Sequence, residues 1–227
     1  LFKKNYNPIF IFTNDLININ IIESKIKHIL KLNNNKRIYA RNCIVKEINT
    51  KQKSEFLKNN HIQGNDSANI KLGLFYENKL VSVMTFCKPR ISLGFKDKSK
   101  YDYELSRFAY DINYNIVGGF SKLFKYFERN YEWKKIVTYA DKKYSTGNVY
   151  IKNNWKFSHE SQPSYNYIDL SSNELLIEPR FKYRKNNIQN ILGNIDDFSN
   201  KTERQILSEF DKYQFYNLGN YVFEYSK

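Results

Sequence analysis

Hydrophobic and polar positions along this chain follow a pattern that predicts a mixed α/β protein. Short β-branched and aromatic runs indicate strands, and apolar residues repeated at three- and four-residue steps indicate helices. The predicted strands cover residues 9–13, 44–48, 70–76, 80–86, 103–110, 135–140, 155–159, 165–170, 213–217 and 221–225. The predicted helices cover residues 16–32, 51–59, 118–130, a short segment across 149–150, and 202–210.

Small polar residues mark where these elements begin and turn. Thr50, Ser145 and Thr202 stand at the expected starts of helices, where a hydroxyl oxygen accepts a hydrogen bond from a free backbone N–H. Residues 77–79 separate two strands by a tight hairpin, and residues 218–220 are expected to do the same near the end of the chain.

Between residues 44 and 170 the order of elements, β-α-β-β-β-α-β-α-β-β, predicts an α+β fold. An antiparallel meander should lead into a right-handed βαβ crossover, giving a mixed, mostly antiparallel sheet flanked by helices. A ligand crevice is expected near the crossover. We expect three parts: a strand-helix tail (residues 1–35), a main domain (36–172), and a basic extension with a helix and a hairpin (173–227).

Composition excludes several classes of protein. The 227 residues are 41% hydrophobic and 17% aromatic, which is enough to bury a core and argues against disorder. No apolar run approaches the roughly 18 to 20 residues that a membrane helix needs. Cys43 and Cys87 lie far apart, which fits buried thiols in a reducing compartment. The chain begins at Leu1 and not at Met, so we expect a fragment of a longer protein.

The charge favours a polyanionic partner. Lys and Arg number 37 against 23 Asp and Glu, a net charge of +14, although an AT-rich coding sequence would also enrich lysine. DNA is the favoured partner, because cations near phosphates release condensed counterions. A membrane surface is disfavoured, since no basic amphipathic helix has a wide apolar face. The candidates for DNA contact, against the alternative of a solvated basic face, are Arg107, Lys142, Lys143, Arg180, Lys182, Arg184 and Lys185.

Two segments resemble the GNAT acyltransferase fold. They are residues 117–123, Val-Gly-Gly-Phe-Ser-Lys-Leu at a helix start, and residues 148–157, Asn-Val-Tyr-Ile-Lys-Asn-Asn-Trp-Lys-Phe. Residues 139–150, from Tyr-Ala-Asp to Gly-Asn-Val-Tyr, are closer to the Mom-like branch of phage-encoded GNAT relatives, which modify adenine in DNA. This resemblance spans roughly residues 38–170 and implies a GNAT-like domain in the cytoplasm of an infected bacterium.

The resemblance also implies a cofactor site. Acetyl-CoA or a related acyl donor would bind with its diphosphate at the loop of residues 115–121, through Gly118, Gly119 and Ser121, with Asn148 nearby. Phe120 departs from the family pattern, because it occupies a position that is usually small. The alternative is that the glycines only permit a tight strand-to-helix turn.

Catalytic roles follow from the same resemblance. Tyr150 matches the tyrosine that many GNAT enzymes use as general acid, and the alternative is a core aromatic residue. Tyr139 and Asp141 end a strand, where Asp141 could accept a hydrogen bond from an exocyclic amine or act as a base; the alternative is a turn residue. Arg107 is expected on a phosphate or base, and the alternative is an ion pair with Glu104.

A second resemblance is to phage endonucleases of the homing or Vsr-like type. In these proteins a nuclease domain ends in a strand and helix like residues 9–30, and is followed by segments like 38–43, 61–64 and 70–74. The resemblance implies that the nuclease residues lay upstream of Leu1, and that this chain is associated with an upstream nuclease domain.

No metal site is predicted. The three histidines lack metal-ligand spacing, although His61 is a catalytic candidate. Asp66 with Glu77 and Lys79 fits the spacing of a PD-(D/E)xK nuclease, but Glu77 and Lys79 fall at a predicted hairpin tip and not on a strand, so we interpret this match as coincidental.

The leading hypothesis is a phage or mobile-element protein that binds DNA and modifies a base. One alternative is a non-catalytic module that positions an endonuclease on DNA, which Phe120 favours. The other is a conventional acyl-CoA-dependent N-acetyltransferase, which would be indifferent to DNA. The oligomeric state is not predicted from the sequence.

Overall fold

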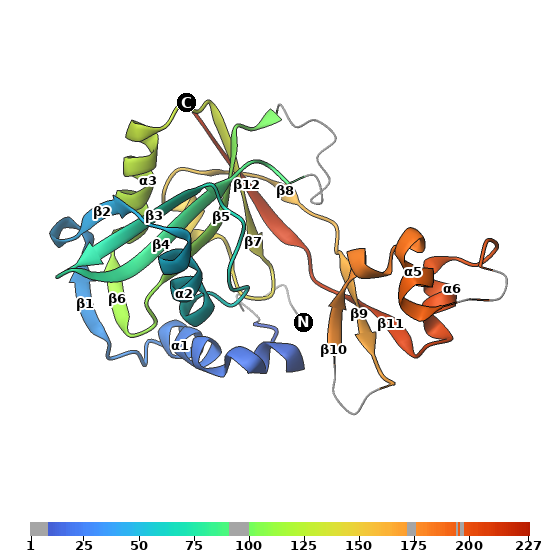
Figure 1. Ribbon diagram of the computed structural model, residues 1–227. Coiled ribbons are helices and arrows are strands. Elements are labelled where there is room, and N and C mark those ends of the chain that lie inside the picture. The colour runs from blue at the N-terminus through green and yellow to red at the C-terminus, as the bar shows by residue number, and fades with distance from the viewer. Residues whose placement is uncertain (1–8, 91–99, 172–175, 194, 196–197) are drawn as a thin grey trace. The chain divides into compact units, whose positions relative to one another are not determined.

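The computed structural model describes residues 9–90, 100–171, 176–193, 195 and 198–227 (Figure 1). These residues belong to two compact units. The larger unit contains residues 18–140, 145–159 and 221–227, and the smaller contains residues up to 17, 141–144 and 160–220.

The larger unit is built on a seven-stranded sheet in the order β2-β3-β4-β5-β7-β12-β8. Neighbouring strands from β2 to β5 are antiparallel, and β5 pairs with β7 in parallel. The predicted α+β class, with a mixed and mostly antiparallel sheet flanked by helices, is therefore confirmed, as is the parallel crossover. The strands are β2 (Ile44–Glu47), β3 (Ile70–Tyr76), β4 (Lys79–Cys87), β5 (Tyr103–Tyr110), β7 (Lys135–Asp141), β12 (Asn220–Ser226) and β8 (Lys156–Glu160).

Helices cover both faces of this sheet. Successive residues of a strand point to opposite faces, and on β4 Met84 packs in the cluster that contains α3 while Val83 packs in the cluster that contains α2. The helices of this unit are α1 (Ile19–Ile29), α2 (Thr50–Asn60), α3 (Gly119–Asn130) and the short α4 (Asn148–Ile151). The unit also contains the 3-10 turn η2 (Ala40–Asn42).

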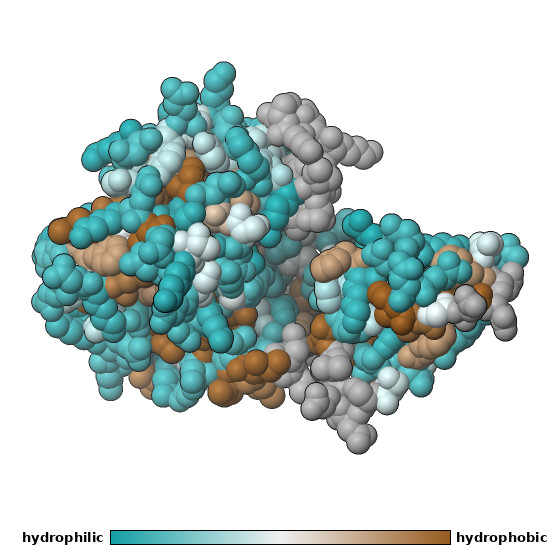
Figure 2. Space-filling model, viewed as in Figure 1, coloured by the Kyte–Doolittle hydropathy of each residue, from teal (hydrophilic) through white to brown (hydrophobic). Residues whose placement is uncertain are grey.

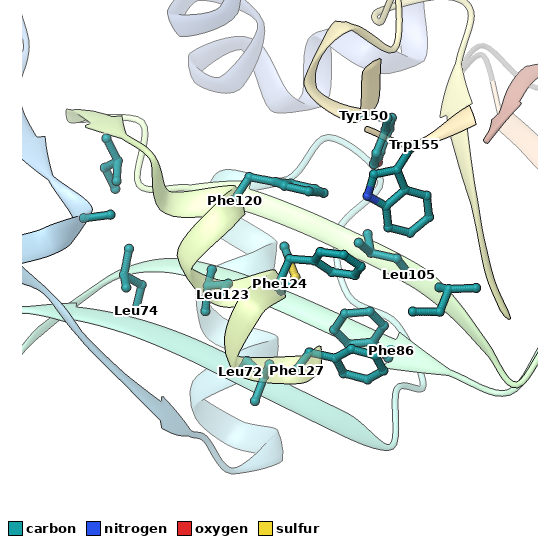
Figure 3. Close-up of a cluster of buried hydrophobic side chains, with 14 of the residues drawn as sticks. Leu72, Leu74, Phe86, Leu105, Phe120, Leu123, Phe124, Phe127, Tyr150 and Trp155 are labelled. Carbon is teal, nitrogen blue, oxygen red and sulfur yellow. The ribbon is translucent and has the colours of Figure 1, made fainter. Parts of the chain in front are cut away.

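The main core lies between α3 and the sheet. Phe120, Leu123, Phe124 and Phe127 form the inner face of α3 and point toward the sheet, where Phe86 stacks on Phe127 at 3.8 Å between ring centroids (Figure 3). Each fully buried Phe contributes roughly 2 to 3 kcal/mol. The crossover helix is thus held by its aromatic face.

The other face carries a buried ion pair. Lys53, on α2, donates to Asp66 Oδ1 at 2.9 Å, and both side chains are at most 4% exposed. Thr85 on β4 donates to the second carboxylate oxygen of Asp66 at 2.6 Å. Burial alone would raise the pKa of Asp66, but these hydrogen bonds outweigh it and lower the pKa. The pair fixes the loop of residues 61–66 against β4.

The smaller unit has its own sheet and core. Its three strands are ordered β10-β9-β11, and both neighbouring pairs are antiparallel. Its core is aromatic and aliphatic, with Tyr167, Tyr183, Ile188, Ile206 and Leu207 buried. Its elements are η1 (Thr13–Asn18, whose last residue lies in the larger unit), β9 (Tyr165–Asp169), β10 (Leu176–Pro179), η5 (Arg180–Tyr183), α5 (Lys185–Leu192), α6 (Glu203–Ser208) and β11 (Lys212–Tyr216).

The predicted final hairpin is wrong. β11 pairs with β9 in the small sheet, whereas β12 lies between β7 and β8 in the large sheet. Gly219 turns the chain between them with a φ of +75°, and its N–H donates to Asn217 Oδ1. The chain does turn at these residues, but β11 and β12 do not pair with each other, because each pairs with strands of a different sheet.

The predicted strand at residues 9–13 is also wrong. The Asp15 carboxylate accepts a hydrogen bond from the Phe12 N–H at 2.8 Å, and the Asp15 N–H donates to the Phe12 carbonyl. An Asp side chain that bonds nearby backbone competes with strand pairing. Residues 9–12 therefore have no regular structure and lead into η1, and the helix that follows covers Ile19–Ile29 in place of residues 16–32.

Two predicted helix caps shift by one or two residues. Asn49, and not Thr50, caps α2 through a capping box with Gln52. Gly147, and not Ser145, precedes α4, and Ser145 Oγ instead accepts from the Gly147 N–H at 3.1 Å. Thr202 caps α6 as predicted.

A parallel strand pair was missed. β1 (Lys36–Tyr39) pairs with β6 (Tyr114–Val117), so the predicted loop of residues 115–121 is a strand followed directly by α3. The predicted hairpin between β3 and β4 is confirmed: Glu77 and Asn78 both have positive φ. None of the helices in the described part of the chain is long and apolar enough to span a bilayer.

Removing Lys53 should destabilise the larger unit strongly. The substitution Lys53→Met leaves the Asp66 carboxylate buried without its cation, and we expect the free energy of unfolding to fall by about 3 kcal/mol. Chemical denaturation measures the change. The matched control is Lys27→Met, which breaks an ion pair with Glu23 that is 55% exposed on both sides and should cost under about 0.5 kcal/mol. Equal losses in the two variants would contradict the proposed role of the buried pair.

Candidate functional site

β5 and β7 pair only over a short parallel ladder, and we call the part of the sheet past that ladder the opening. Their parallel ladder covers three residue pairs, Tyr103–Leu105 with Ile136–Thr138, while β5 continues to Tyr110 and β7 to Asp141. Ligands of mixed sheets bind beyond the carboxyl ends of parallel strands. The residues immediately past the ladder are therefore the candidates for chemistry.

Arg107 lies just past the last ladder pair on β5. Its Nη1 donates to the Ser106 carbonyl at 2.8 Å, and its Nε donates to the Gly64 carbonyl at 3.4 Å. Among the described residues no carboxylate forms an ion pair with it, so the predicted alternative of a pair with Glu104 is wrong. Burial, and then the charge of Arg90, lower the pKa of Arg107. The result is a partly buried cation whose charge is not neutralised by a described carboxylate.

Glu104 pairs with a different cation. Its side chain is 1% exposed and forms a salt bridge with Arg90, whose Nε lies 3.0 Å from Glu104 Oε1. Like Asp66, it is therefore a buried carboxylate already occupied by a basic partner. The charges of Asp66, Arg90 and Glu104 act on the pKa of Arg107, but neither carboxylate forms an ion pair with it.

Tyr150 comes from α4 and lies in the core beside the opening. Its hydroxyl is hydrogen-bonded to Thr138 Oγ1 at 3.3 Å, and its ring packs against Phe120 and Trp155 (Figure 3). Burial raises the pKa of Tyr150, against smaller opposing effects of Thr138 and the Arg107 charge. The phenol is thus kept protonated at neutral pH, as a proton donor must be.

Tyr139 and Asp141 fall in different units. Tyr139 is in the larger unit, where burial and the charge of Glu104 raise its pKa. Asp141 is in the smaller unit, where its Oδ1 accepts from the Lys143 N–H at 2.9 Å and its carbonyl accepts from the Tyr144 N–H. Asp141 therefore closes a turn, which was the alternative to its predicted role as a base.

The predicted cofactor residues lie at the start of α3 and at the start of α4. Gly118 has a φ of +78° and precedes α3, and a Cβ at Gly119 would lie 2.7 Å from the Tyr110 ring. The Phe120 N–H donates to Tyr110 Oη at 3.2 Å, and Ser121 Oγ donates to Asn153 Oδ1 at 2.5 Å. Asn148 is exposed at the start of α4.

Gly118 and Ser121 do line a cavity of about 590 Å³ beside α3. We call it the α3 groove; its basic side chains are Arg41, Lys122, Lys125 and Arg129. None of these four was singled out from the sequence. The spacing of Lys122, Lys125 and Arg129, at i, i+3 and i+7, was the available signal, because it places three cations along one face of a helix.

The other predicted DNA contacts lie in the smaller unit, and several have local partners. Lys142 pairs with Glu160 at 2.5 Å, Lys143 pairs with Asp15 at 3.2 Å, and Lys182 pairs with Glu178. Lys185 Nζ donates to the carbonyls of Ser199 and Lys201. Arg180 and Arg184 are exposed, and the guanidinium of Arg180 lies 4.6 Å from the centre of the Tyr165 ring.

His61 begins the loop that reaches Arg107. Its Nδ1 accepts from the Gln63 N–H at 3.1 Å. Burial, and then the charges of Arg107 and Lys25, lower the pKa of His61 to about 3. Within the described ranges no group of three His, Cys, Asp or Glu side chains could hold a metal ion, and both cysteines are buried free thiols. Glu77 sits at the hairpin tip, as the interpretation of the nuclease-like spacing required.

Comparison with known protein families gives one finding. Residues 42–212 match the model of the Mom protein family. The match covers the whole of β5, α3, β7 and α4, and so includes the opening of the sheet. No curated protein matches the chain.

The neutral His61 predicts a specific loss of stability in acid. The unfolded chain binds a proton at His61 near pH 6.5, whereas the folded chain does so near pH 3, so stability is fully present above pH 6.5 and falls as the pH drops toward 3. At pH 5 the native chain should have lost about 1 to 2 kcal/mol more than the variant His61→Asn, relative to pH 7.5. Urea denaturation at both pH values measures this difference. The control His159→Asn, at an exposed site, should keep the native pH dependence, and a His61→Asn variant that also keeps it would refute the assignment.

Proposed function

This chain belongs to the Mom protein family, and we propose that it modifies bases in bacteriophage DNA at the opening between β5 and β7. Family membership supports a phage DNA-modification function. The opening supplies the position, because the family match includes it and because ligands collect past the end of parallel strand pairs.

The observation that carries the proposed site is the state of Arg107. A partly buried guanidinium with no described carboxylate partner attracts an anion more strongly than a solvated one, because the surrounding dielectric is lower. A DNA phosphate is such an anion. Arg107 would hold a backbone phosphate so that the adjoining base enters the opening. Its two carbonyl contacts fix the direction of the guanidinium.

Tyr150 is the proposed proton donor at this site. Its hydroxyl contacts Thr138, the last residue of the ladder on β7, and its raised pKa keeps it protonated, so that it can donate to a basic atom bound beside it. Tyr139 remains a predicted member of the site, and the role of Asp141 stays a prediction that the proposal does not use.

The acyl donor implied by a GNAT-like transferase fits the predicted cradle poorly. Such a carrier would supply an activated acyl group to an amine. A diphosphate at the start of α3 needs free backbone N–H groups, but that of Phe120 is bonded to Tyr110, and Phe120 itself packs against Phe108 and Tyr150. Acyl transfer through Gly118, Gly119, Ser121 and Asn148 is therefore not part of the proposal.

The same contacts favour a second candidate function, a non-catalytic module that positions another enzyme on DNA. The Phe120 ring is 2% exposed and packs against Phe108 and Tyr150, at a position that is usually small in the family pattern. In this case the partner would be a nuclease domain, whose association with the chain stays a prediction.

Modification can be tested in cells. The chain is expressed in a bacterium that carries a plasmid, and the plasmid DNA is digested to nucleosides and analysed by mass spectrometry. We expect a deoxyadenosine of altered mass, whose mass difference identifies the added group. Arg107→Ala should reduce its amount at least tenfold, because the phosphate is no longer held, and Tyr150→Phe should reduce it similarly while keeping the packed ring.

The matched control is Arg37→Ala, which removes an exposed arginine from β1 and should leave the amount of product unchanged. Circular dichroism confirms that each variant is folded. Full product from a folded Arg107→Ala variant would refute the assignment of the site. No modified nucleoside from the native chain, in cells where it is soluble and folded, would reject base modification and favour the positioning module.

A further inference from the structure

The α3 groove is lined by four cations, and none of them forms an ion pair with a carboxylate of the described residues. We infer that it binds the phosphate backbone of double-stranded DNA, an inference that rests on DNA being the substrate in the proposed function. The predicted contacts of the smaller unit would then be secondary to this surface.

The groove has one sign of charge. Its lining includes Arg41, Lys122, Lys125 and Arg129 but no Asp or Glu. A concave surface lined by one sign of charge concentrates counter-ions and raises the rate at which a polyanion associates.

Most of these cations are not needed by the fold. Lys125 and Arg129 are exposed, and no carboxylate of the described residues pairs with them or with Arg41, whose guanidinium lies 4.9 Å from the centre of the Tyr39 ring. Lys122 differs, since its Nζ donates to the Cys43 carbonyl. In contrast, Lys142, Lys143 and Lys182 are all neutralised by carboxylates of their own unit.

The spacing of the cations suits a nucleic-acid strand. Lys122, Lys125 and Arg129 span seven residues of α3, which is about 10 Å along the helix axis. One DNA strand places a phosphate about every 3.4 Å of rise. The row is therefore long enough to face more than one phosphate of a strand, and Arg41 adds a fourth cation on the η2 side of the groove.

Exposed apolar groups indicate a long ligand and not an enclosed small one. Tyr39, Ile44 and Val117 line the groove and are 40%, 63% and 43% exposed. Figure 2 shows brown hydrophobic atoms set among the hydrophilic surface in the region of β2 and α3. Sites for small molecules bury most of their ligand, whereas an open groove with apolar edges can contact successive sugars of a polymer.

The test is a titration of the full chain with a fluorescently labelled DNA duplex, followed by anisotropy at several salt concentrations. Each phosphate contact contributes about 0.9 to the slope of log K against log salt. The triple variant Arg41→Ala, Lys125→Ala, Arg129→Ala should lower the slope by about 2 to 3 and weaken binding at least tenfold at low salt.

Two other variants serve as comparisons. Lys51→Ala, Lys58→Ala, Arg204→Ala removes the same number of positive charges from exposed positions outside the groove and should change the slope by less than about 1. Arg180→Ala, Arg184→Ala tests the exposed basic residues of the smaller unit and should behave in the same way. Melting temperatures verify that all variants are folded.

Three results would overturn the inference. They are an unchanged slope in the folded groove variant, an equal loss in the charge-matched control, or a larger loss in the Arg180 and Arg184 variant. A further arm adds coenzyme A to the native chain: if it displaces DNA and its stabilising effect disappears in the groove variant, the groove is a site for a small phosphate-bearing molecule. This titration detects binding without modification, so it fails or succeeds independently of the nucleoside analysis.

Discussion

The short parallel ladder between β5 and β7 determines most of the architecture of the larger unit. Parallel neighbours cannot be joined by a tight turn, so the chain must cross over the sheet, and α3 is that crossover. Because the ladder stops after three residue pairs, the two strands have no direct hydrogen bonds beyond it. The same constraint therefore creates both the helix that covers the core and the unpaired strand ends beyond the ladder.

The two faces of α3 have different roles. The inner face is aromatic and stabilises the sheet through Phe124 and Phe127. The outer face carries Lys125 and Arg129, which contribute no described contact to the core. Cations on the polar face of an amphipathic helix can bind a polyanion without loss of packing. Stability and recognition are separated here by the period of the helix.

Pairing of charges distinguishes structural from functional cations. With a net charge of +14, basic residues by themselves say little about where DNA binds. Lys53 and Arg90 are held by buried carboxylates, whose removal would leave an uncompensated charge. Arg107 forms an ion pair with neither of these carboxylates and is bonded to carbonyl groups, which orient a guanidinium without neutralising it. Its position, more than its residue type, makes it the candidate for binding an anion.

Local pattern alone was enough for the elements that carry the site. The alternation of β5 and β7, the apolar period of α3 and the glycines before it appear directly in the sequence, as did the α+β class. Asn49 in place of Thr50, and Gly147 in place of Ser145, show the precision of such signals, which identify these helix starts to within one or two residues.

Only the tertiary structure decided which strands pair and which charges are neutralised. β11 and β12 adjoin in sequence but join different sheets, and β1 pairs with β6 across more than seventy residues. Periodicity records which face of a strand is buried but not which edge it pairs with, because backbone hydrogen bonds are the same for every residue type. Contacts between distant segments also decide that Glu104 pairs with Arg90 and not with Arg107. In the same way they bring Arg41 into one groove with Lys125 and Arg129. The sequence by itself thus determined most of the helices and strands and the excess of positive charge. The tertiary structure decided which cations form no ion pair and can bind a ligand.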